Sequence, residues 1–144
     1  MHTIRQLLET KGYDIWSISS QATAYEALQI MSEKDVGALL VIDEGKLVGI
    51  FSERDYARKV ILKGRSSRDV SVGELMTHEV FYIGPENTIQ DCMALMTDKR
   101  IRHVPVMENE RLIGIVTMGD VVYRIISGQE HTIEQLEKYI AGGY

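Results

Sequence analysis

Two stretches of the chain carry apolar residues at the spacing of an amphipathic helix. These residues are Ala24, Ala27, Leu28 and Met31 in the first stretch, and Ile89, Cys92, Met93 and Met96 in the second. Positions i, i+3, i+4 and i+7 share one face of an α-helix, so each stretch is predicted to be a helix with one buried face. Thr23 precedes the first helix and Thr88 precedes the second. An acidic residue stands three positions after each threonine, which is the pattern of a capping box at a helix start.

After each of these helices the pattern changes to two short apolar runs separated by a polar turn. The runs are 38–42 and 47–51 in the first half, and 103–107 and 112–116 in the second. Short apolar runs around turn residues predict buried hairpin strands. Pro105 lies in the second hairpin, and because proline has no amide hydrogen we expect its strand to lie at a sheet edge.

Helical spacing returns after each hairpin, from Glu53 to about Lys63 and from Met118 to about Ser127. Residues 16–18 and 80–83 are β-prone and are predicted to form a first strand in each half. The predicted order in each half is therefore strand, helix, strand, strand, helix.

The two halves are an internal repeat with a constant shift of 65 positions. Without a gap, Ile18 falls on Ile83, Gly49 on Gly114 and Asp55 on Asp120, as read along the chain. Two copies at this spacing mean two supersecondary units of one kind, because the period is too long for a solenoid turn.

We divide the chain into a N-terminal helix at 1–14, a first repeat at 15–63, a linker at 64–76, a second repeat at 77–127 and a C-terminal helix at 128–144. Residues 72–76 are predicted to be a short helical lead-in to the second repeat. Each repeat has about 50 to 60 residues, which is little for an independent core. We therefore expect an α/β (α+β) fold in which the two repeats pack with pseudo-twofold symmetry.

Composition narrows the classes of function. The 144 residues carry a formal net charge of −5, with 16 basic against 21 acidic residues, so binding of nucleic acid is disfavoured. One cysteine allows no intramolecular disulfide and indicates a reducing compartment or at least a fold without disulfides. We find no signal peptide and no apolar run of membrane-spanning length. We expect a soluble cytoplasmic protein with no membrane partner.

The most informative motif occurs once in each repeat, between the last strand and the last helix. Ser52 is followed by Asp55, and Thr117 by Asp120, three residues later in both cases. One interpretation is a capping box with a purely structural role. The other is a ligand site, in which the hydroxyl and free amides hold an anion and the carboxylate accepts hydrogen bonds from a ribose diol.

Other chemistry has little support in the sequence. The four histidines include no pair at i, i+3 or i, i+4, and Cys92 lies on a helical core stripe, so no metal site is assigned. Lys59, Lys63, Arg65 and Arg68 form a basic run that is typical of a solvated face. We find no nucleophile with a base, no glycine-rich dinucleotide turn and no Walker loop, so no catalytic residue is assigned and an enzyme is not expected.

The segments 49–55 and 114–120, Gly-Ile-Phe-Ser-Glu-Arg-Asp and Gly-Ile-Val-Thr-Met-Gly-Asp, resemble the paired motifs of cystathionine-beta-synthase (CBS) domains. The preceding strands at 36–41 and 101–106 share this resemblance, which covers about 15–127 and is similar to small stand-alone CBS-pair proteins of bacteria and plant organelles. The resemblance implies two βαββα units, a cleft on either side of the pseudo-dyad, and binding of AMP, ATP or NAD(H).

The resemblance also implies roles for individual residues. Asp55 and Asp120 would hold the ribose hydroxyls, and Ser52 and Thr117 would lie near ribose or phosphate. Arg102 and His103 would supply positive charge for a phosphate, although a solvated arginine and a core histidine are open alternatives. The candidate ligand-binding residues are Ser52, Arg54, Asp55, Arg102, His103, Pro105, Thr117, Met118, Gly119, Asp120, Ile18, Gly37 and Ala38.

The two repeats differ at one important place. Where the second repeat has Arg102 and His103, the first has Gly37 and Ala38, so we expect two unequal sites. Arg54 has no basic counterpart in the second repeat and would bring charge to one of them.

The function we expect is that of a regulatory module that senses energy or redox state through an adenine nucleotide. AMP is the first expected ligand, with ATP and NAD(H) as further ones, and the signal would pass to an unknown protein partner. A homodimer is expected through the apolar helical faces Leu28/Met31 and Met93/Met96, together with the terminal helices. The alternatives are a structural dimerisation unit without ligand and a nucleotide-processing enzyme.

Overall fold

The computed structural model describes residues 2–128, so the helix expected at 128–144 lies outside the described residues apart from Gly128. The chain divides into two compact units. The repeat-1 unit comprises Asp14–Phe81, and the repeat-2 unit comprises Met1–Tyr13 together with Tyr82–Tyr144. The N-terminal segment therefore belongs to the unit of the second repeat.

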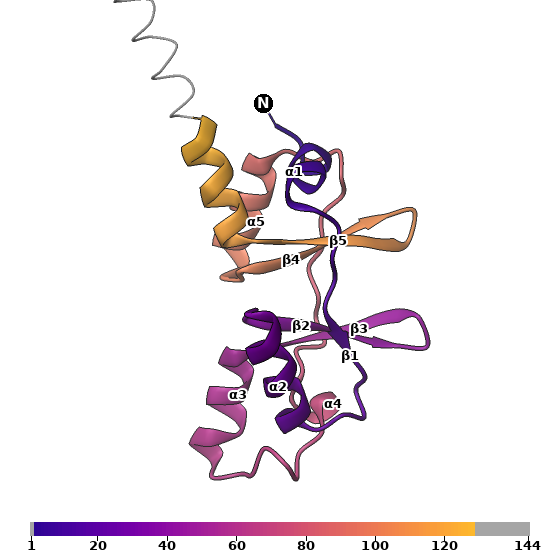
Figure 1. Ribbon diagram of the computed structural model, residues 1–144, viewed down its shortest axis with the longest axis vertical. Helices are drawn as coiled ribbons and strands as arrows, with labels where there is room; N and C mark the ends of the chain where they lie inside the picture. The colour runs from indigo at the N-terminus through magenta and orange to yellow at the C-terminus, as the bar shows by residue number, and fades with distance from the viewer. Residues whose placement is uncertain (1, 129–144) are drawn as a thin grey trace, which may run out of the picture. The chain divides into compact units, whose positions relative to one another are not determined.

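The repeat-1 unit follows the predicted order of elements (Figure 1). Its elements are β1 (Ser17–Ile18), α2 (Ala24–Lys34), β2 (Ala38–Asp43), β3 (Lys46–Ser52), α3 (Glu53–Lys59), the 3-10 helix η1 (Ile61–Lys63) and α4 (Val72–Leu75). The sheet order is β1-β2-β3, with β1 parallel to β2 and β2 antiparallel to β3. The helix predicted from Glu53 to about Lys63 is thus an α-helix that gives way to a 3-10 turn.

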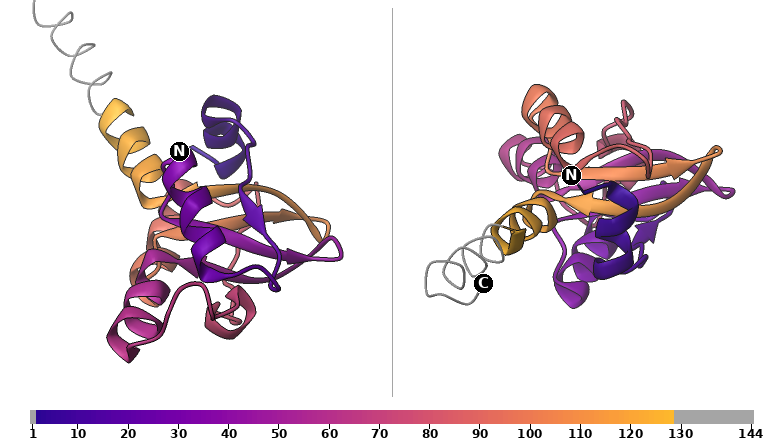
Figure 2. Two further views of the ribbon diagram at one scale, coloured as in Figure 1. Left: turned by 60° about the horizontal axis from the view of Figure 1, so that its bottom comes forward. Right: turned by 90° about the horizontal axis from the view of Figure 1, so that it is seen from above.

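The repeat-2 unit has the same arrangement, but the described residues of its sheet form two strands instead of three. Its elements are α1 (Ile4–Lys11), α5 (Ile89–Lys99), β4 (His103–Glu108), β5 (Arg111–Thr117) and a helix over 118–128. That helix continues directly from β5, as both views in Figure 2 show. Strands β4 and β5 are antiparallel, and the described residues of this sheet form two strands.

The strand predicted at 80–83 is wrong, because Ile83 forms only an isolated parallel bridge with Val106. Pro105 explains the difference. In the repeat-1 unit the amide of Leu40 donates to the Trp16 carbonyl at 3.2 Å. Pro105 occupies the position equivalent to Leu40 and has no N–H to donate. Among the described residues β5 is the one ladder neighbour of the Pro105 strand. On its other side the Ile83 amide donates to the Pro105 carbonyl at 3.1 Å, and the Met107 amide donates to the Ile83 carbonyl at 2.9 Å, so this edge is partly covered.

Side-chain hydroxyls cap both predicted helix starts, but of the two predicted capping boxes only the one at α5 is complete. Thr88 and Asp91 form a complete capping box at α5, and Thr23 accepts a hydrogen bond from the Glu26 amide at α2. Thr3 caps α1 and Ser71 caps α4 in the same way. These caps satisfy amides that a helix leaves without an intrahelical acceptor.

Each unit has its own hydrophobic core. Three of the four residues in each predicted helical stripe are buried, namely Ala24, Ala27 and Met31 in α2, and Ile89, Cys92 and Met96 in α5. The fourth position differs, because Leu28 is half-buried and Met93 is 41% exposed. The predicted stripes are thus confirmed except at the position that the fold turns outward.

Each repeat is completed by the helix that precedes the other repeat. The α1 side chains of Ile4 and Leu8 are fully buried in the repeat-2 core, a burial worth about 1.5–3 kcal/mol for each. In the repeat-1 unit, Val72 of α4 and Met76, which directly follows α4, occupy the corresponding positions.

The backbone contacts of these two helices match. The Ile4 amide donates to the Asn87 carbonyl at 2.8 Å, and the Val72 amide donates to the Ala22 carbonyl at 2.7 Å. Asn87 and Ala22 are equivalent positions of the two repeats. The segments of helices α1 and α4 therefore bring residues from outside the repeated motifs close to β5 and β3, respectively.

Candidate functional site

The motif of the first repeat forms a capping box at the end of β3. The Ser52 amide donates to Asp55 Oδ2 at 3.0 Å, and the Asp55 amide donates to Ser52 Oγ at 3.2 Å. The Ser52 hydroxyl also donates to Asp55 Oδ2, at 3.1 Å. The carboxylate is 8% exposed. The structural interpretation of the motif is thus realised in the repeat-1 unit.

The second carboxylate oxygen of Asp55 is occupied as well. Thr77 Oγ1 donates to Asp55 Oδ1 at 3.1 Å, and Lys59 Nζ lies 3.1 Å from the same oxygen. Lys59 Nζ also donates to the Leu75 carbonyl at 2.8 Å. A buried carboxylate needs such charge-assisted hydrogen bonds to offset its loss of hydration. Lys59 therefore belongs to this cluster, although its side chain is 44% exposed.

The motif of the second repeat is also a capping box, but a more open one. The Thr117 amide donates to Asp120 Oδ2 at 2.8 Å, and the Asp120 amide donates to Thr117 Oγ1 at 3.1 Å. Lys11 Nζ of α1 lies 2.6 Å from Asp120 Oδ2. The side chain of Asp120 is 23% exposed, against 11% for Asp55. Within the described part of the chain the contacts to Asp120 use Oδ2, which leaves Oδ1 for a further donor.

Strand pairing brings the predicted residues of each repeat together. Ala38 pairs with Ser52 across β2 and β3, and His103 pairs with Thr117 across β4 and β5. The chain then turns into the following helix with a matching backbone bond. The Glu53 amide donates to the Gly37 carbonyl at 3.0 Å, and the Met118 amide donates to the Arg102 carbonyl at 2.9 Å. We call these clusters the repeat-1 half-site and the repeat-2 half-site.

His103 is half-buried at the start of β4. Burial lowers the pKa of His103 below its usual value, and the charges of Lys11 and Arg102 lower it further, while Asp120 acts in the opposite direction. The imidazole is therefore mostly neutral at pH 7. In a neutral ring one nitrogen donates a hydrogen bond and the other accepts one. The side chain of Arg102 is exposed, so it is the permanent positive charge of this pair.

The remaining predicted residues frame the half-sites. Arg54, Met118 and Gly119 are exposed in the first turns of the helices that follow β3 and β5. Ile18 and Pro105 are buried, so they shape the strands instead of offering polar groups.

Sequence reasoning missed one cation, Lys11, and one hydroxyl, that of Thr77, which touch the two carboxylates from other elements. Lys11 precedes the first repeat and Thr77 is the first residue of the second, so both lie outside the repeated hydroxyl–carboxylate motifs. Lys11 Nζ donates to the Ile115 carbonyl at 2.5 Å, across 104 positions of sequence. No local spacing could signal such a contact.

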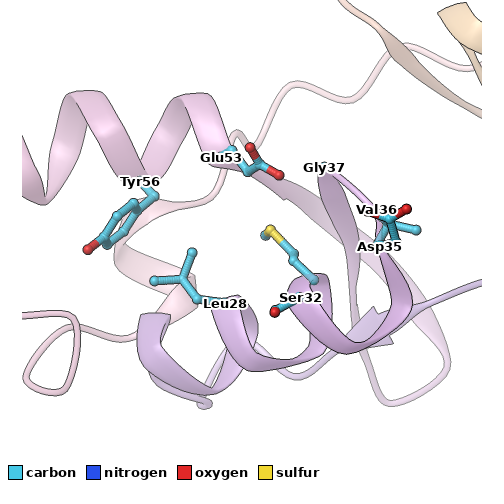
Figure 3. Close-up of a pocket in the computed structure, with 8 residues that line it drawn as sticks. Leu28, Ser32, Asp35, Val36, Gly37, Glu53 and Tyr56 are labelled. Carbon is cyan, nitrogen blue, oxygen red and sulfur yellow. The ribbon is translucent and has the colours of Figure 1, made fainter.

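A hollow of about 540 Å³ lies on the helical face of the repeat-1 unit, between α2 and α3 (Figure 3). In Figure 3, Leu28 and Ser32 line it from α2, and Glu53 and Tyr56 line it from α3. The other lining residues are Met31, Asp35, Val36 and Gly37. Its polar rim is acidic and therefore disfavours a phosphate. It is separate from the carboxylate of Asp55, which does not line it.

Two further properties bear on function. Among residues 2–128 no group of three or more His, Cys, Asp or Glu side chains is arranged to hold a metal ion. No helix over the same residues is both long and apolar enough to cross a membrane.

The chain is similar to known proteins over nearly its whole length. The family model for the CBS domain matches residues 5–62 and 72–127. A mitochondrial CBS domain-containing protein of Arabidopsis thaliana, CBSX3, is 40% identical over 152 residues, which cover 99% of this chain and 73% of that protein.

Solved structures are similar as well. A protein with CBS domains from Burkholderia ambifaria MC40-6 is 43% identical with a TM-score of 0.85, covering 88% of this chain and 96% of that one. The CBS domain pair of protein MJ0100, solved with 5′-methylthioadenosine and S-adenosyl-L-methionine, is 26% identical with a TM-score of 0.77 over 90% of this chain and 98% of that one.

Proposed function

The chain belongs to the CBS domain family as a pair of CBS repeats, and from this premise we propose that it is a regulatory module that binds an adenine nucleotide. In this role it senses energy or redox state and passes the signal to a partner protein. CBS-domain proteins are generally regulatory, and a ligand regulates by its different affinity for two arrangements of the protein.

The repeat-2 half-site is the observation that carries this proposal. Asp120 offers a partly exposed carboxylate whose Oδ1 is open to a ribose hydroxyl. Lys11, Arg102 and the neutral ring of His103 lie around it and can donate to a phosphate. A carboxylate for the diol and cations for the phosphate are the two groups that a nucleotide needs.

AMP is our first candidate ligand, followed by ATP and NAD(H). The adenosyl compounds bound to the MJ0100 CBS pair support an adenosine ligand of some kind. The positive charge around Asp120 supports a phosphorylated one.

Calorimetric titration tests the proposal with AMP, ADP, ATP, NAD⁺ and NADH against the wild type, Asp120→Asn and Asp55→Asn. We expect Asp120→Asn to weaken binding about tenfold or more, because a hydrogen bond to a charged group is lost. Asn retains the shape of Asp and can still accept from the capping amide. Absence of binding of all five nucleotides to the wild type would reject the proposal.

A structural function is the second candidate, and the saturation of Asp55 favours it for the first repeat. Four donor contacts already satisfy that carboxylate. If both motifs are only caps, no nucleotide will raise the melting temperature, since a ligand stabilises only the state that it binds. An enzyme would convert the bound nucleotide. We expect no conversion, so the nucleotide recovered after overnight incubation should be intact.

We also propose that the protein is a homodimer in the cytoplasm. Three residues of the helix over 118–128, Met118, Val122 and Ile126, are large, apolar and exposed, and they recur every four positions on one face. Such a stripe suits a twofold contact between copies. Light scattering of Val122→Glu beside the exposed control Glu53→Gln tests this, and we expect the first variant to shift to monomer.

The cytoplasmic location is supported by Cys92, because a buried free cysteine is compatible with a reducing compartment.

A further inference from the structure

Lys11 links the N-terminal helix to the carboxylate of the second repeat. Its Nζ lies 2.6 Å from Asp120 Oδ2 and 2.5 Å from the Ile115 carbonyl oxygen. Lys11 is the last residue of α1, and the chain leaves the helix at Gly12, whose φ of 106° suits glycine. The ammonium group is therefore delivered to the half-site from a segment that the repeat motif does not include.

The equivalent place in the repeat-1 unit is occupied by a neutral residue. The Thr77 amide donates to the Ile50 carbonyl at 2.8 Å, and its hydroxyl donates to Asp55 Oδ1 at 3.1 Å. Ile50 and Ile115 are equivalent positions of the two repeats. One lysine side chain thus makes, in the repeat-2 unit, the two contacts that a threonine makes in the repeat-1 unit.

This exchange changes the charge of the two half-sites. In the repeat-2 half-site the cations Lys11 and Arg102 accompany a single carboxylate, and His103 is neutral. In the repeat-1 half-site the positions of Arg102 and His103 are held by Gly37 and Ala38. Asp55 has a cation of its own, Lys59, which comes from the same helix α3. The difference is that Lys11 and Arg102 bring positive charge to the repeat-2 half-site from outside the helix that follows β5.

The ion pair of Lys11 is one that a ligand can replace. Both side chains are partly exposed, at 28% for Lys11 and 23% for Asp120, and ion pairs open to solvent contribute little to stability. Lysine carries its charge on a flexible four-carbon stem, so the ammonium can move without the helix moving. A ribose hydroxyl that donates to Asp120 would leave Lys11 free to pair with a phosphate.

We propose that Lys11 is a specificity-determining residue of the repeat-2 half-site, which selects adenosine 5′-phosphates over unphosphorylated adenosine. Without ligand, Lys11 neutralises Asp120. With ligand, the ribose takes over Asp120 and the ammonium binds the phosphate. This inference rests on the proposed function, because it names the ligand class of the same site.

The test is an NMR titration of the wild type, Lys11→Met and Lys11→Arg with two probes, AMP and adenosine. The amides of Met118 and Asp120 report the repeat-2 half-site, and those of Glu53 and Asp55 report the repeat-1 half-site. Lys46→Met is the matched control, because it removes one positive charge from the exposed first residue of β3. Methionine keeps most of the aliphatic stem of lysine, and Lys11→Gln serves as a second variant if Lys11→Met does not fold.

We expect the repeat-2 amides of the wild type to report AMP binding about tenfold or more tighter than adenosine binding, as a charge-assisted contact to phosphate predicts. In Lys11→Met the two affinities should converge through loss of AMP affinity. Lys11→Arg and Lys46→Met should keep the wild-type preference.

The failures are distinguishable. If neither probe moves any of the four amides in the wild type, the proposed function itself fails. If the wild type binds AMP but Lys11→Met keeps the same preference over adenosine, the role of Lys11 is rejected and nucleotide binding stands. An equal loss for both probes would mean that Lys11 only supports the fold, and a wild type without preference would also overturn the inference.

Discussion

Asp55 and Lys59 form an ion pair one helical turn apart, with Lys59 Nζ 3.1 Å from Asp55 Oδ1. Asp55 is buried, and Lys59 extends from it to the carbonyl of Leu75. The pair therefore joins the end of β3, the helix α3 and the short helix α4. A residue expected to bind ribose also holds three elements of the repeat-1 unit together.

We predict that Asp55→Ala lowers the free energy of unfolding by about 2–4 kcal/mol, because Thr77, Lys59 and Ser52 lose a common acceptor in a buried place. Asp55→Asn should cost less, since its amide oxygen still accepts one hydrogen bond. Urea denaturation measures both. Glu53→Ala is the control on the same helix turn, and its exposed side chain should leave stability within about 0.5 kcal/mol. A loss for Asp55→Ala no larger than that of the control would contradict the account.

Two equivalent glycines let the completing helices approach the strands. A Cβ at Gly49 would lie 2.6 Å from Met76 Sδ and 3.0 Å from the Thr77 carbonyl oxygen, whereas a Cβ at Gly114 would lie 3.0 Å from Leu8 Cδ2. We predict that Gly49→Ala costs about 2 kcal/mol and Gly114→Ala about 1 kcal/mol, because overpacking against backbone relaxes less than overpacking against a leucine.

The matched control for both is Gly119→Ala. Its Cβ would make only an ordinary contact of 3.6 Å with Thr117 Oγ1, inside a helix. Alanine is favoured over glycine there by about 0.5–1 kcal/mol, so this variant should be more stable than the wild type. Thermal melts of the three variants rank them, and the reverse order of Gly49→Ala and Gly114→Ala would refute the prediction.

Acidification should destabilise the protein through His103. Burial lowers its pKa in the folded state, so below the unfolded pKa near 6.5 the unfolded chain binds more protons than the native one. The contribution of His103 is fully present above that pH and is lost as the pH falls through the folded pKa. Urea denaturation between pH 7 and 5 should show a smaller decline in His103→Gln than in the wild type. Parallel curves for the two proteins would argue against it.

Cys92 should be unreactive in the folded protein. Burial raises the pKa of its thiol to about 11, and the charge of Asp120 adds to the effect. Since the thiolate is the nucleophile, a thiol reagent at pH 8 should label Cys92 only after denaturation. Labelling followed with and without urea checks this, and rapid labelling of the native protein would show that the helix α5 opens.

Much of the fold follows from local spacing. The helices α2 and α5, the two hairpins, the caps and the repeat all rest on residues a few positions apart, and the structure confirms them. The strand predicted at 80–83 fails because one backbone N–H is absent at Pro105, although that residue itself pointed to a sheet edge. Leu28 and Met93 fit the apolar stripe by spacing. They are less buried than the rest of the stripe, because the core covers a narrower part of the helix surface than the stripe spans.

The sequence by itself determined the repeated unit, its hydroxyl–carboxylate motifs and the unequal basic residues at Arg102 and His103. Only the tertiary structure decided that α1 completes the second repeat and α4 the first, and hence that Lys11 meets Asp120 while Thr77 meets Asp55. The physical reason is that a capping box closes within one helical turn, whereas the charge and exposure of its carboxylate depend on groups that the folded chain brings from distant segments.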